Sequence, residues 1–335
     1  MKLISASRRT DIPAFYSRWF LRRLAEGFCD WVNPFSGQVL HVSLRPQDTL
    51  GIVCWTRNPA PLAASLDALQ QAGYRFAFHF TINGYPGELE SHNPPAETAV
   101  RAFRDLARRL PADRAWWRYD PILLTEATPS AWHEQNFSRL AEALEGQTRR
   151  CYFSFASFYR KTRRNLDASG LPWHEPAIGE KLELARRLRL IARRHGIDMF
   201  SCCDDQLLAA GVGKAHCVDA GVFLPEPGKG GADTRVRGVE MSLDARAEAA
   251  PASGWATETS SPFKLAPTRA GCGCTQSVDI GAYDTCAFGC AYCYATTNRR
   301  AALARLVEHD PDDTALWRPK PTAGPPATEP AAREV

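Results

Sequence analysis

The sequence predicts an α/β protein, a full or partial parallel β/α barrel like a TIM barrel, with a C-terminal cysteine-rich iron–sulfur segment. Short apolar runs alternate with amphipathic helical stretches through the first two-thirds of the 335 residues. Such alternation indicates a parallel sheet, open or closed into a barrel. Polar clusters follow nearly every expected strand, and cysteines crowd residues 272–293.

Eight strands are expected from apolar runs, and alternation is clearest where Phe76, Phe78 and Phe80 share one face. The expected strands are Leu3–Ala6, Val39–Ser43, Leu50–Trp55, Arg75–Ile82, Ala115–Tyr119, Arg150–Phe155, Asp198–Cys202 and Ala215–Val218. Several of the expected helices begin at a proline, which suits the first helical turn. These helices are Pro13–Glu26, Pro61–Ala72, Pro95–Leu110, Pro129–Leu144, Ile178–His195 and the short Asp204–Ala210.

Composition divides the chain into four parts. Residues 1–224 form the expected barrel-like domain, 225–262 a flexible insert rich in glycine and alanine, 263–300 the cluster-binding segment, and 301–335 a C-terminal helix and disordered tail, from Pro311 onward. No apolar run approaches the roughly 18 residues of a membrane span, so we expect a cytoplasmic protein with no membrane partner. In a reducing compartment, clustered cysteines indicate metal or redox roles rather than disulfides.

Cys286, Cys290 and Cys293 have the spacing C-x3-C-x2-C. Three such thiolates can hold three irons of a [4Fe–4S] cluster and leave the fourth iron open. We expect that iron to chelate S-adenosylmethionine (SAM) and to cleave it to methionine and a 5′-deoxyadenosyl radical, with an electron from flavodoxin or ferredoxin. Tyr292 could pack against the cluster or adenine. The carboxylates of Asp279 and Asp284 could bind SAM or could equally cap turns.

A second thiol group could form from Cys272 and Cys274 together with Cys203 and Cys217. Four thiolates would hold a second iron–sulfur cluster or a structural zinc ion. The alternative is that Cys202 and Cys217 are small buried hydrophobic residues. Three further cysteines lie inside expected helices or strands and are interpreted as packing residues: Cys29, Cys54 and Cys151.

Polar side chains at the ends of the strands would share one face of a parallel barrel, where chemistry takes place. Arginines there would attract carboxylate or phosphate groups of a small-molecule substrate. Taken singly, the same residues could be helix caps and solvated cations. The candidates for substrate contact are Arg8, Arg9, Asp11, Arg57, Asn58, Tyr119 and Asp120.

Several motifs occur in a characteristic order: Ile4–Pro13, Trp55–Pro59, Trp117–Pro121 and Cys272–Ala295. They resemble a bacterial family known as domain of unknown function 1848, over roughly residues 1–224 and 263–300. The resemblance implies no established activity. Its C-terminal cysteines are similar to the cluster motif of radical SAM enzymes, whose domains resemble full or partial α/β barrels. In that superfamily the cysteine loop follows the first strand, whereas here it follows the last, and in a closed barrel these strands are neighbours.

The expected function is that of a radical SAM-like enzyme with an unknown substrate. The alternative is a structural zinc or iron–sulfur module on a nucleic-acid-binding protein, with arginine pairs such as Arg163-Arg164 and Arg299-Arg300 near aromatic residues. The net charge of +4 is too small to indicate nucleic acid by itself. A third possibility is a metal-independent hydrolase that uses His41, His79 or Asp120.

Overall fold

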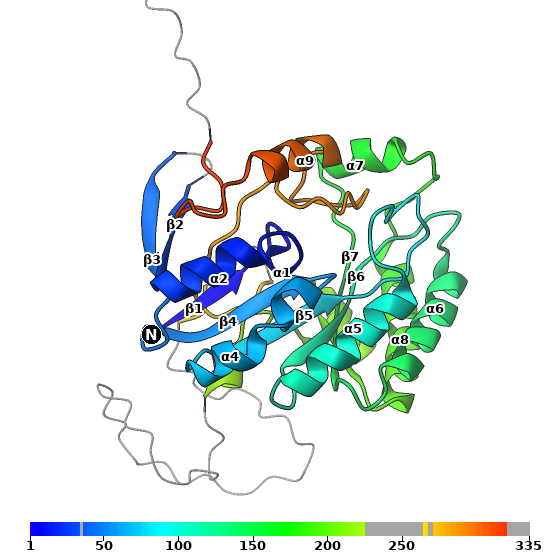
Figure 1. The fold of residues 1–335 in the computed structure, drawn as a ribbon. Coiled ribbons are helices and arrows are strands. Elements are labelled where there is room, and N and C mark those ends of the chain that lie inside the picture. The colour runs from blue at the N-terminus through cyan, green and yellow to red at the C-terminus, as the bar shows by residue number, and fades with distance from the viewer. Residues whose placement is uncertain (34–35, 225–263, 267–270, 320–335) are drawn as a thin grey trace, which may run out of the picture.

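An eight-stranded parallel sheet forms the centre of the molecule (Figure 1). The computed structural model describes residues 1–33, 36–224, 264–266 and 271–319. The strand order is β10-β1-β4-β5-β6-β7-β8-β9. The bounds are β1 Lys2–Ala6, β4 Thr49–Thr56, β5 Phe76–Thr81, β6 Ala115–Ile122, β7 Arg150–Phe155, β8 Asp198–Ser201, β9 Gly213–Lys214 and β10 Ser277–Asp279. This confirms the α/β class and is consistent with a partial barrel.

The membership of the sheet differs from the prediction. Residues Val39–Ser43 do form a strand, β3, but it pairs antiparallel with β2 (Phe28–Val32) in a separate two-stranded sheet. The eighth strand of the parallel sheet is instead β10, at the edge beside β1. Its three residues are too few to show alternation in the sequence. The expected last strand, Ala215–Val218, is not a strand; the two-residue strand β9 (Gly213–Lys214) ends just before it. Apolar alternation identifies strands without identifying their partners.

Helices cover the outer face of the sheet, and the expected helices Pro13–Glu26 and Pro61–Ala72 are each broken in two (Figure 1). Their bounds are α1 Ile12–Phe15, α2 Ser17–Glu26, α3 Ala60–Ala63, α4 Leu66–Gln71, α5 Ala96–Arg109, α6 Ser130–Ala143, α7 Arg160–Asp167, α8 Ile178–Arg194, η1 Asp205–Ala210, η2 Ala220–Phe223 and α9 Arg299–Glu308. Within the described residues, no helix combines the length and apolar character needed to cross a bilayer.

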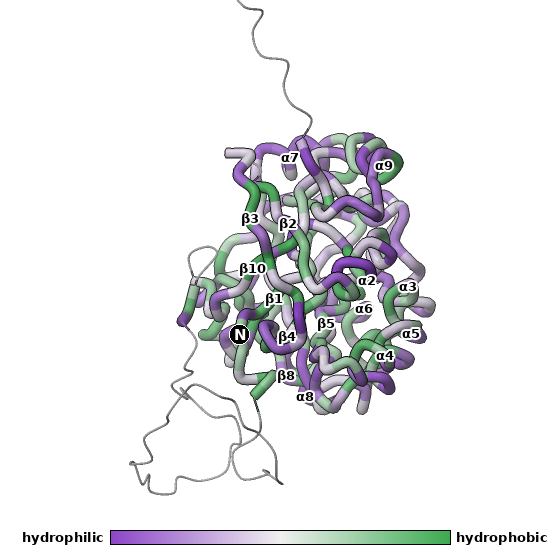
Figure 2. Tube along the Cα trace, turned by 60° about the vertical axis from the view of Figure 1, so that its left-hand side comes forward, coloured by the Kyte–Doolittle hydropathy of each residue, from purple (hydrophilic) through white to green (hydrophobic). Residues whose placement is uncertain are grey.

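The sheet separates two apolar cores, because side chains alternate between its faces. The outer core, which includes Phe78 and Phe103, lies between strands and helices. The inner core includes Val53, Trp116 and Phe223 and is enclosed by the curl of the sheet. Hydrophobic stretches follow the central strands and hydrophilic ones gather on the outer helices (Figure 2).

The two edges of the sheet approach each other without pairing as strands. Thr275, just before β10, donates its backbone N–H to the carbonyl of Val218 at 2.8 Å, beyond β9. On its other side β10 pairs in parallel with β1, with Ser5 opposite Asp279. The chain that leaves β10 therefore emerges beside the carboxyl end of β1. This position brings the late cysteine motif to the face where the other strands end.

Residues 311–319 belong to the folded structure, although composition placed them in a disordered tail. Trp19 donates its indole N–H to the carbonyl of Asp313 at 2.9 Å, and Ala315 bridges to Asp30 of β2. Leu316 is buried. Proline content averaged over the whole tail hid these apolar anchors. The insert 225–262 and residues 320–335 lie outside the described residues.

Gly51→Ala tests the inner core. A Cβ at Gly51 would lie 2.3–2.5 Å from the ring of Phe223, which is itself buried. We expect overpacking to lower the free energy of unfolding by about 1–3 kcal/mol, measured by urea denaturation. Gly87→Ala is the control, since nothing lies within 4 Å of its Cβ. Equal stability of the two variants would contradict this packing.

Candidate active site at the carboxyl ends of the strands

The cysteine loop is attached to the barrel through the buried hydroxyl of Tyr292. Arg57 donates to this oxygen at 2.6 Å and Asn83 at 3.0 Å, while Tyr292 itself donates to Glu90. Arg57 also forms an ion pair with Glu90 at 2.8 Å. We call these four residues the Tyr292 clamp. Because all four are largely buried, the clamp fixes the loop by charge-assisted hydrogen bonds that solvent screens weakly.

The electrostatics of the clamp favour a charged guanidinium. Burial by itself lowers the pKa of Arg57, but Glu90 and the neighbouring Tyr292 and Cys290 raise it well above its ordinary value. Asn83 holds the clamp against β6, because it accepts the N–H of Asp120 at 2.8 Å. Glu90 and Asn83 were not among the predicted site residues. Glu90 lies in a segment with no periodic or motif signal, whereas Asn83 directly follows the expected strand Arg75–Ile82 and carried the same strand-end signal as the chosen candidates.

The three thiols of the loop lie within electrostatic reach of one another. Burial, then Cys293 and Asp11, raise the pKa of Cys286 well above its usual value. Burial raises the pKa of Cys290 to about 11, although Arg57 lowers it. The amide of Asn93 donates to Cys290 Sγ at 3.6 Å. Gly289, with φ +74°, makes the tight turn between them.

The donor types of this loop are those that an iron–sulfur cluster requires. Among the residues that the structure describes, no group of three or more His, Cys, Asp or Glu side chains could hold a metal ion as it stands. A cubane binds each thiolate through a different iron, so its ligands surround a volume rather than one point. Mutually coupled thiols beside a cation and an amide donor match the environment that tunes iron–sulfur clusters.

Asp11 connects the loop that follows β1 to the loop that follows β4. It accepts the N–H of Ala14 at 3.0 Å, which caps α1, and the N–H of Arg57 at 2.7 Å. Burial raises its pKa to about 7, against these hydrogen bonds, which lower it. Asp11 is thus a buried positioning group beneath the cysteine loop, and the cap that was the simpler expectation is present.

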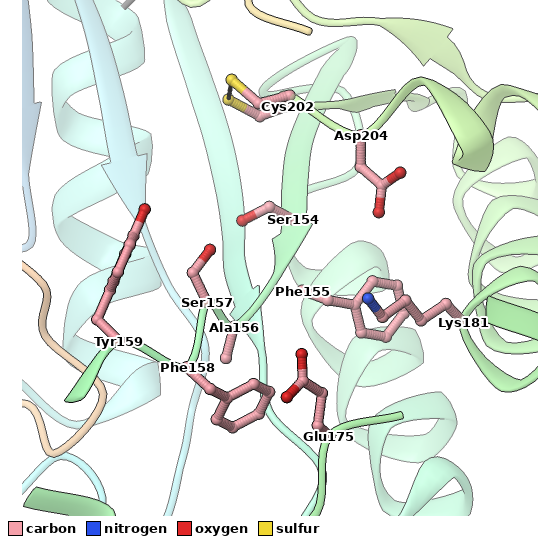
Figure 3. A pocket seen from close by; sticks show the side chains of 11 residues that line it. Ser154, Phe155, Ala156, Ser157, Phe158, Tyr159, Glu175, Lys181, Cys202 and Asp204 are labelled. Carbon is pink, nitrogen blue, oxygen red and sulfur yellow. Dashed lines mark hydrogen bonds between the residues drawn. The ribbon is translucent and has the colours of Figure 1, made fainter. Parts of the chain in front are cut away.

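Arg118 and Asp120 form a buried ion pair on the inner face of β6. Ser154 of β7 donates to the other carboxylate oxygen of Asp120 at 2.6 Å. A pocket of ≈ 360 Å³ opens beside them, between the ends of β7 and β8 (Figure 3). Cys202 and Asp204 lie at one end of the pocket and Glu175 at the other (Figure 3). The lining mixes hydroxyl, carboxylate, ammonium and thiol groups, which suits a small polar ligand.

None of the seven predicted substrate-contact residues is among those that line this pocket, and two of them face other parts of the fold. Tyr119 points to the helix side of β6, where its hydroxyl contacts His133 at 2.8 Å, because side chains alternate and Arg118 takes the inner position. Asn58 accepts the N–H of Ala60 at 3.2 Å and so caps the start of α3. Their signal in the sequence was proximity to a strand end, which does not distinguish the two faces.

Asp279 and Asp284 both act within the fold. Asp279 accepts hydrogen bonds from Ser5 at 2.6 Å, from Ser7 at 2.7 Å and from the N–H of Arg8 at 2.9 Å. Asp284 accepts the N–H of Thr297. Their oxygens are therefore engaged by segments distant in the sequence, and contact with SAM stays a prediction.

The two arginines of the first loop point to different places. Arg9 lies over the rings of Trp31 and Tyr283, each at 5.2 Å. Arg8 lies 5.3 Å from the centre of the Trp55 ring, and its buried Nη2 has no hydrogen-bond partner among the residues that the structure describes. Arg8 is the one that faces the inner side of the barrel, near Cys217 and Cys274.

The cysteines expected at a second site also lie together. Cys202 Sγ contacts Cys203 Sγ at 3.6 Å and Cys217 Sγ at 3.4 Å. The thiol of Cys217 is also hydrogen-bonded to that of Cys274, and the thiol of Cys274 to that of Cys272. We call these five side chains the thiol chain. Cys202 and Cys217 were interpreted as possible packing residues; Cys202 links Cys203 to Cys217, and Cys217 is the central member of the chain.

A curled parallel sheet with buried charges and thiols at its carboxyl ends defines an α/β protein with a candidate catalytic face. The chain belongs to the family described as "Domain of unknown function (DUF1848)", whose model matches residues 3–295. Comparison with curated proteins finds no match. Among solved structures, the carboxyl transferase domain of Rhizobium etli pyruvate carboxylase with 3-hydroxypyruvate is similar at 13% identity and a TM-score of 0.22. The alignment covers 62% of this chain and 40% of that chain.

Tyr292→Phe tests the clamp. The change removes the oxygen that Arg57, Asn83 and Glu90 share, and it leaves buried polar groups with fewer partners. We expect the free energy of unfolding of metal-free protein to fall by about 1–3 kcal/mol. The control is Tyr159→Phe, at a ring that is 51% exposed, which should change it by under about 0.5 kcal/mol. Similar values for both variants would contradict the clamp.

Asp11 predicts a dependence of stability on pH. Its folded pKa of about 7 exceeds the unfolded value of about 3.9. The folded state therefore keeps a proton that the unfolded chain releases, and stability falls as pH rises from about 4 to about 7. Asp11→Asn should remove this fall in urea titrations of metal-free protein, whereas the exposed control Asp105→Asn should keep it. Parallel curves for wild type and Asp11→Asn would refute the assignment.

Proposed function

We propose that this protein is an iron–sulfur enzyme of the radical SAM type that acts on a small polar substrate. Cys286, Cys290 and Cys293 would hold the [4Fe–4S] cluster. The observation that carries the proposal is the Tyr292 clamp, which joins the cysteine loop to the carboxyl ends of β4 and β5 through buried charge. A loop with only a structural role on the surface would not need this buried anchor inside the polar face.

The position of the loop supports the same function. It follows β10, which pairs with β1, so it leaves the sheet beside the first strand despite its late place in the sequence. A cysteine loop next to the first strand is what the resemblance to radical SAM enzymes leads one to expect. The permuted chain order is thus compatible with the usual arrangement in space.

The protein would supply charge, orientation and shelter to the cofactors. Bound and reduced, a [4Fe–4S] cluster with one open iron supplies the electron that cleaves SAM. Arg57 would offset the negative charge of the thiolates, and Asn93 would hydrogen-bond the sulfur of Cys290. Phe288 of the loop packs edge-on against Phe15, with ring centres 4.7 Å apart, and helps to exclude water.

Substrate would enter the pocket beside Arg118, Asp120 and Ser154. Arg118 and Ser154 each bind one carboxylate oxygen of Asp120, so Asp120 can accept or orient a polar group without rearranging. The electron would come from a donor such as flavodoxin or ferredoxin. For nucleic-acid binding we find no specific support, since Arg163 pairs with Glu175 at 2.8 Å and Arg299 binds the carbonyl of Ala287 at 2.9 Å.

Anaerobic reconstitution tests the proposal. Wild-type protein loaded with iron and sulfide, then given SAM and dithionite, should form 5′-deoxyadenosine, detected by chromatography and mass spectrometry. SAM should also alter the EPR signal of the reduced cluster. Cys290→Ala should lower product formation at least 100-fold, because a cubane needs all three thiolates.

The matched control is Cys54→Ala, which removes a buried cysteine of the outer core. It should keep product formation within a few-fold of wild type. If fully loaded wild-type protein forms no 5′-deoxyadenosine and SAM leaves its EPR signal unchanged, the proposed function is wrong.

A further inference from the structure

The thiol chain consists of metal-ligating side chains that the proposed cluster does not use. Cys202, Cys203, Cys217, Cys272 and Cys274 come from three separate segments: the end of β8, the stretch after β9, and the approach to β10. Cys202 Sγ lies 3.6 Å from Cys203 Sγ and 3.4 Å from Cys217 Sγ. Four sulfurs bound tetrahedrally at about 2.3 Å from one zinc ion would lie roughly 3.8 Å apart. The sulfurs are therefore spaced closely enough to share a metal.

Local backbone geometry brings these sulfurs together. Adjacent residues of an extended strand point to opposite faces, but Cys203 has φ +59°, and this left-handed turn lets its sulfur meet that of Cys202. A left-handed backbone costs energy at a residue other than glycine and tends to occur at functional sites. The turn thus points to a use for both thiols.

Glycines allow the Cys272–Cys274 segment to approach closely. A Cβ at Gly271 would lie 3.2 Å from the backbone of Cys203, and a Cβ at Gly273 would lie 2.8 Å from the ring of His216. The two glycines beside Cys272 therefore let the thiols of Cys272 and Cys274 lie close to the other three thiols. Such close backbone approach is a common reason for glycine at a binding site.

Positive charge and N–H donors surround the thiol chain. Arg118 Nη1 donates to Cys217 Sγ at 3.6 Å, and the N–H of Val218 points to Cys274 Sγ at 3.4 Å. Arg8 lies near Cys217 and Cys274, and its buried Nη2 meets no hydrogen-bond partner in the described part of the chain. Buried positive charge beside the sulfurs is suited to thiolates bound to a metal, because such thiolates carry negative charge.

We propose that the thiol chain is a second, thiolate-ligated metal centre, separate from the Cys286–Cys293 loop. Its occupant is a soft metal, either one zinc ion or a small iron–sulfur cluster. The sulfurs now contact in a row rather than around one point, in keeping with the lack of a ready-made ion site among the described residues. Rotation about the single side-chain torsion of each cysteine moves its sulfur without moving the backbone.

The centre would clamp the open sheet. Thr275 and Cys274 meet the segment after β9, and β10 follows directly. A metal bound by Cys202, Cys217 and Cys274 would cross-link the two edges of the sheet that no strand pairing joins. It would thereby hold β10, and the cysteine loop after it, in place.

Metal analysis of the full chain tests this centre. Wild-type protein is reconstituted in parallel with zinc alone and with iron plus sulfide, and bound metal and sulfide are counted after desalting. Cys286→Ala/Cys290→Ala/Cys293→Ala should still bind one zinc ion, or one small cluster, per chain. Adding Cys272→Ala/Cys274→Ala to that variant should abolish this binding, whereas adding Cys29→Ala/Cys151→Ala should not. The reconstitution, with zinc or with iron and sulfide, in which the protein retains metal identifies the occupant of the centre.

A second measurement uses wild-type protein and does not depend on folding of the variants. The half-buried Cys202, Cys203 and Cys272 should react with iodoacetamide at least 10-fold more slowly with metal bound than after chelation, by peptide mass spectrometry. Two results together would overturn the proposal. The variant that lacks the Cys286–Cys293 thiols would bind no metal, and the three cysteines of wild-type protein would react with iodoacetamide at the same rate before and after chelation. Because the readouts are metal content and thiol protection, a failure of SAM cleavage would leave this inference standing.

Discussion

The hydrogen bonds to Asp279 are the constraint on which the candidate site depends. The carboxylate ends β10 and accepts hydrogen bonds from Ser5 within β1 and from Ser7 and the N–H of Arg8 in the loop that follows. The carboxyl ends of the last and first strands are thereby fixed side by side. The cysteine loop that follows is then directed to the face where β1, β4 and β5 end. Backbone hydrogen bonds support the same position, because Ile280 donates its N–H to the carbonyl of Ser5 and Ala291 donates to that of Leu89, each at 3.0 Å.

The buried ion pair of Arg57 and Glu90 fixes the position of the cysteine loop on that face. Glu90 and Arg57 would each be costly to bury alone, because an unpaired charge loses its hydration. Tyr292 and Asn83 complete their hydrogen bonding, so the pair is satisfied only when the loop is docked. The clamp therefore selects one position of the loop over others. Specificity of position, more than added stability, is the expected benefit of such a buried polar group.

Sequence patterns predicted the class of fold because they report local alternation. They could not assign Val39–Ser43 to the small sheet, since an antiparallel hairpin and a parallel strand share the same apolar period. They also could not separate Tyr119 from Arg118, which differ only in the face of β6 they occupy. The spacing of Cys286, Cys290 and Cys293 was visible because those ligands are close in sequence. Glu90 and Asn83 were missed because their partners are brought to them only by the fold.

The distribution of cations links the two thiol groups. Arg57 faces Cys290, whereas Arg8 and Arg118 face Cys217 and its neighbours, so each group of sulfurs has its own buried positive charge. Buried guanidinium groups stay protonated and cannot supply or accept protons at neutral pH. Their role on this face is consequently electrostatic, and it favours ligands or ligand sets that carry negative charge. Thiolates, the carboxylate of SAM and an anionic substrate all meet that requirement. The same arginines that the sequence suggested for substrate binding would therefore stabilise the thiolate ligands first. The polar groups that line the open pocket are then Ser154 and its neighbours Glu175 and Lys181, with Asp120 held behind Ser154.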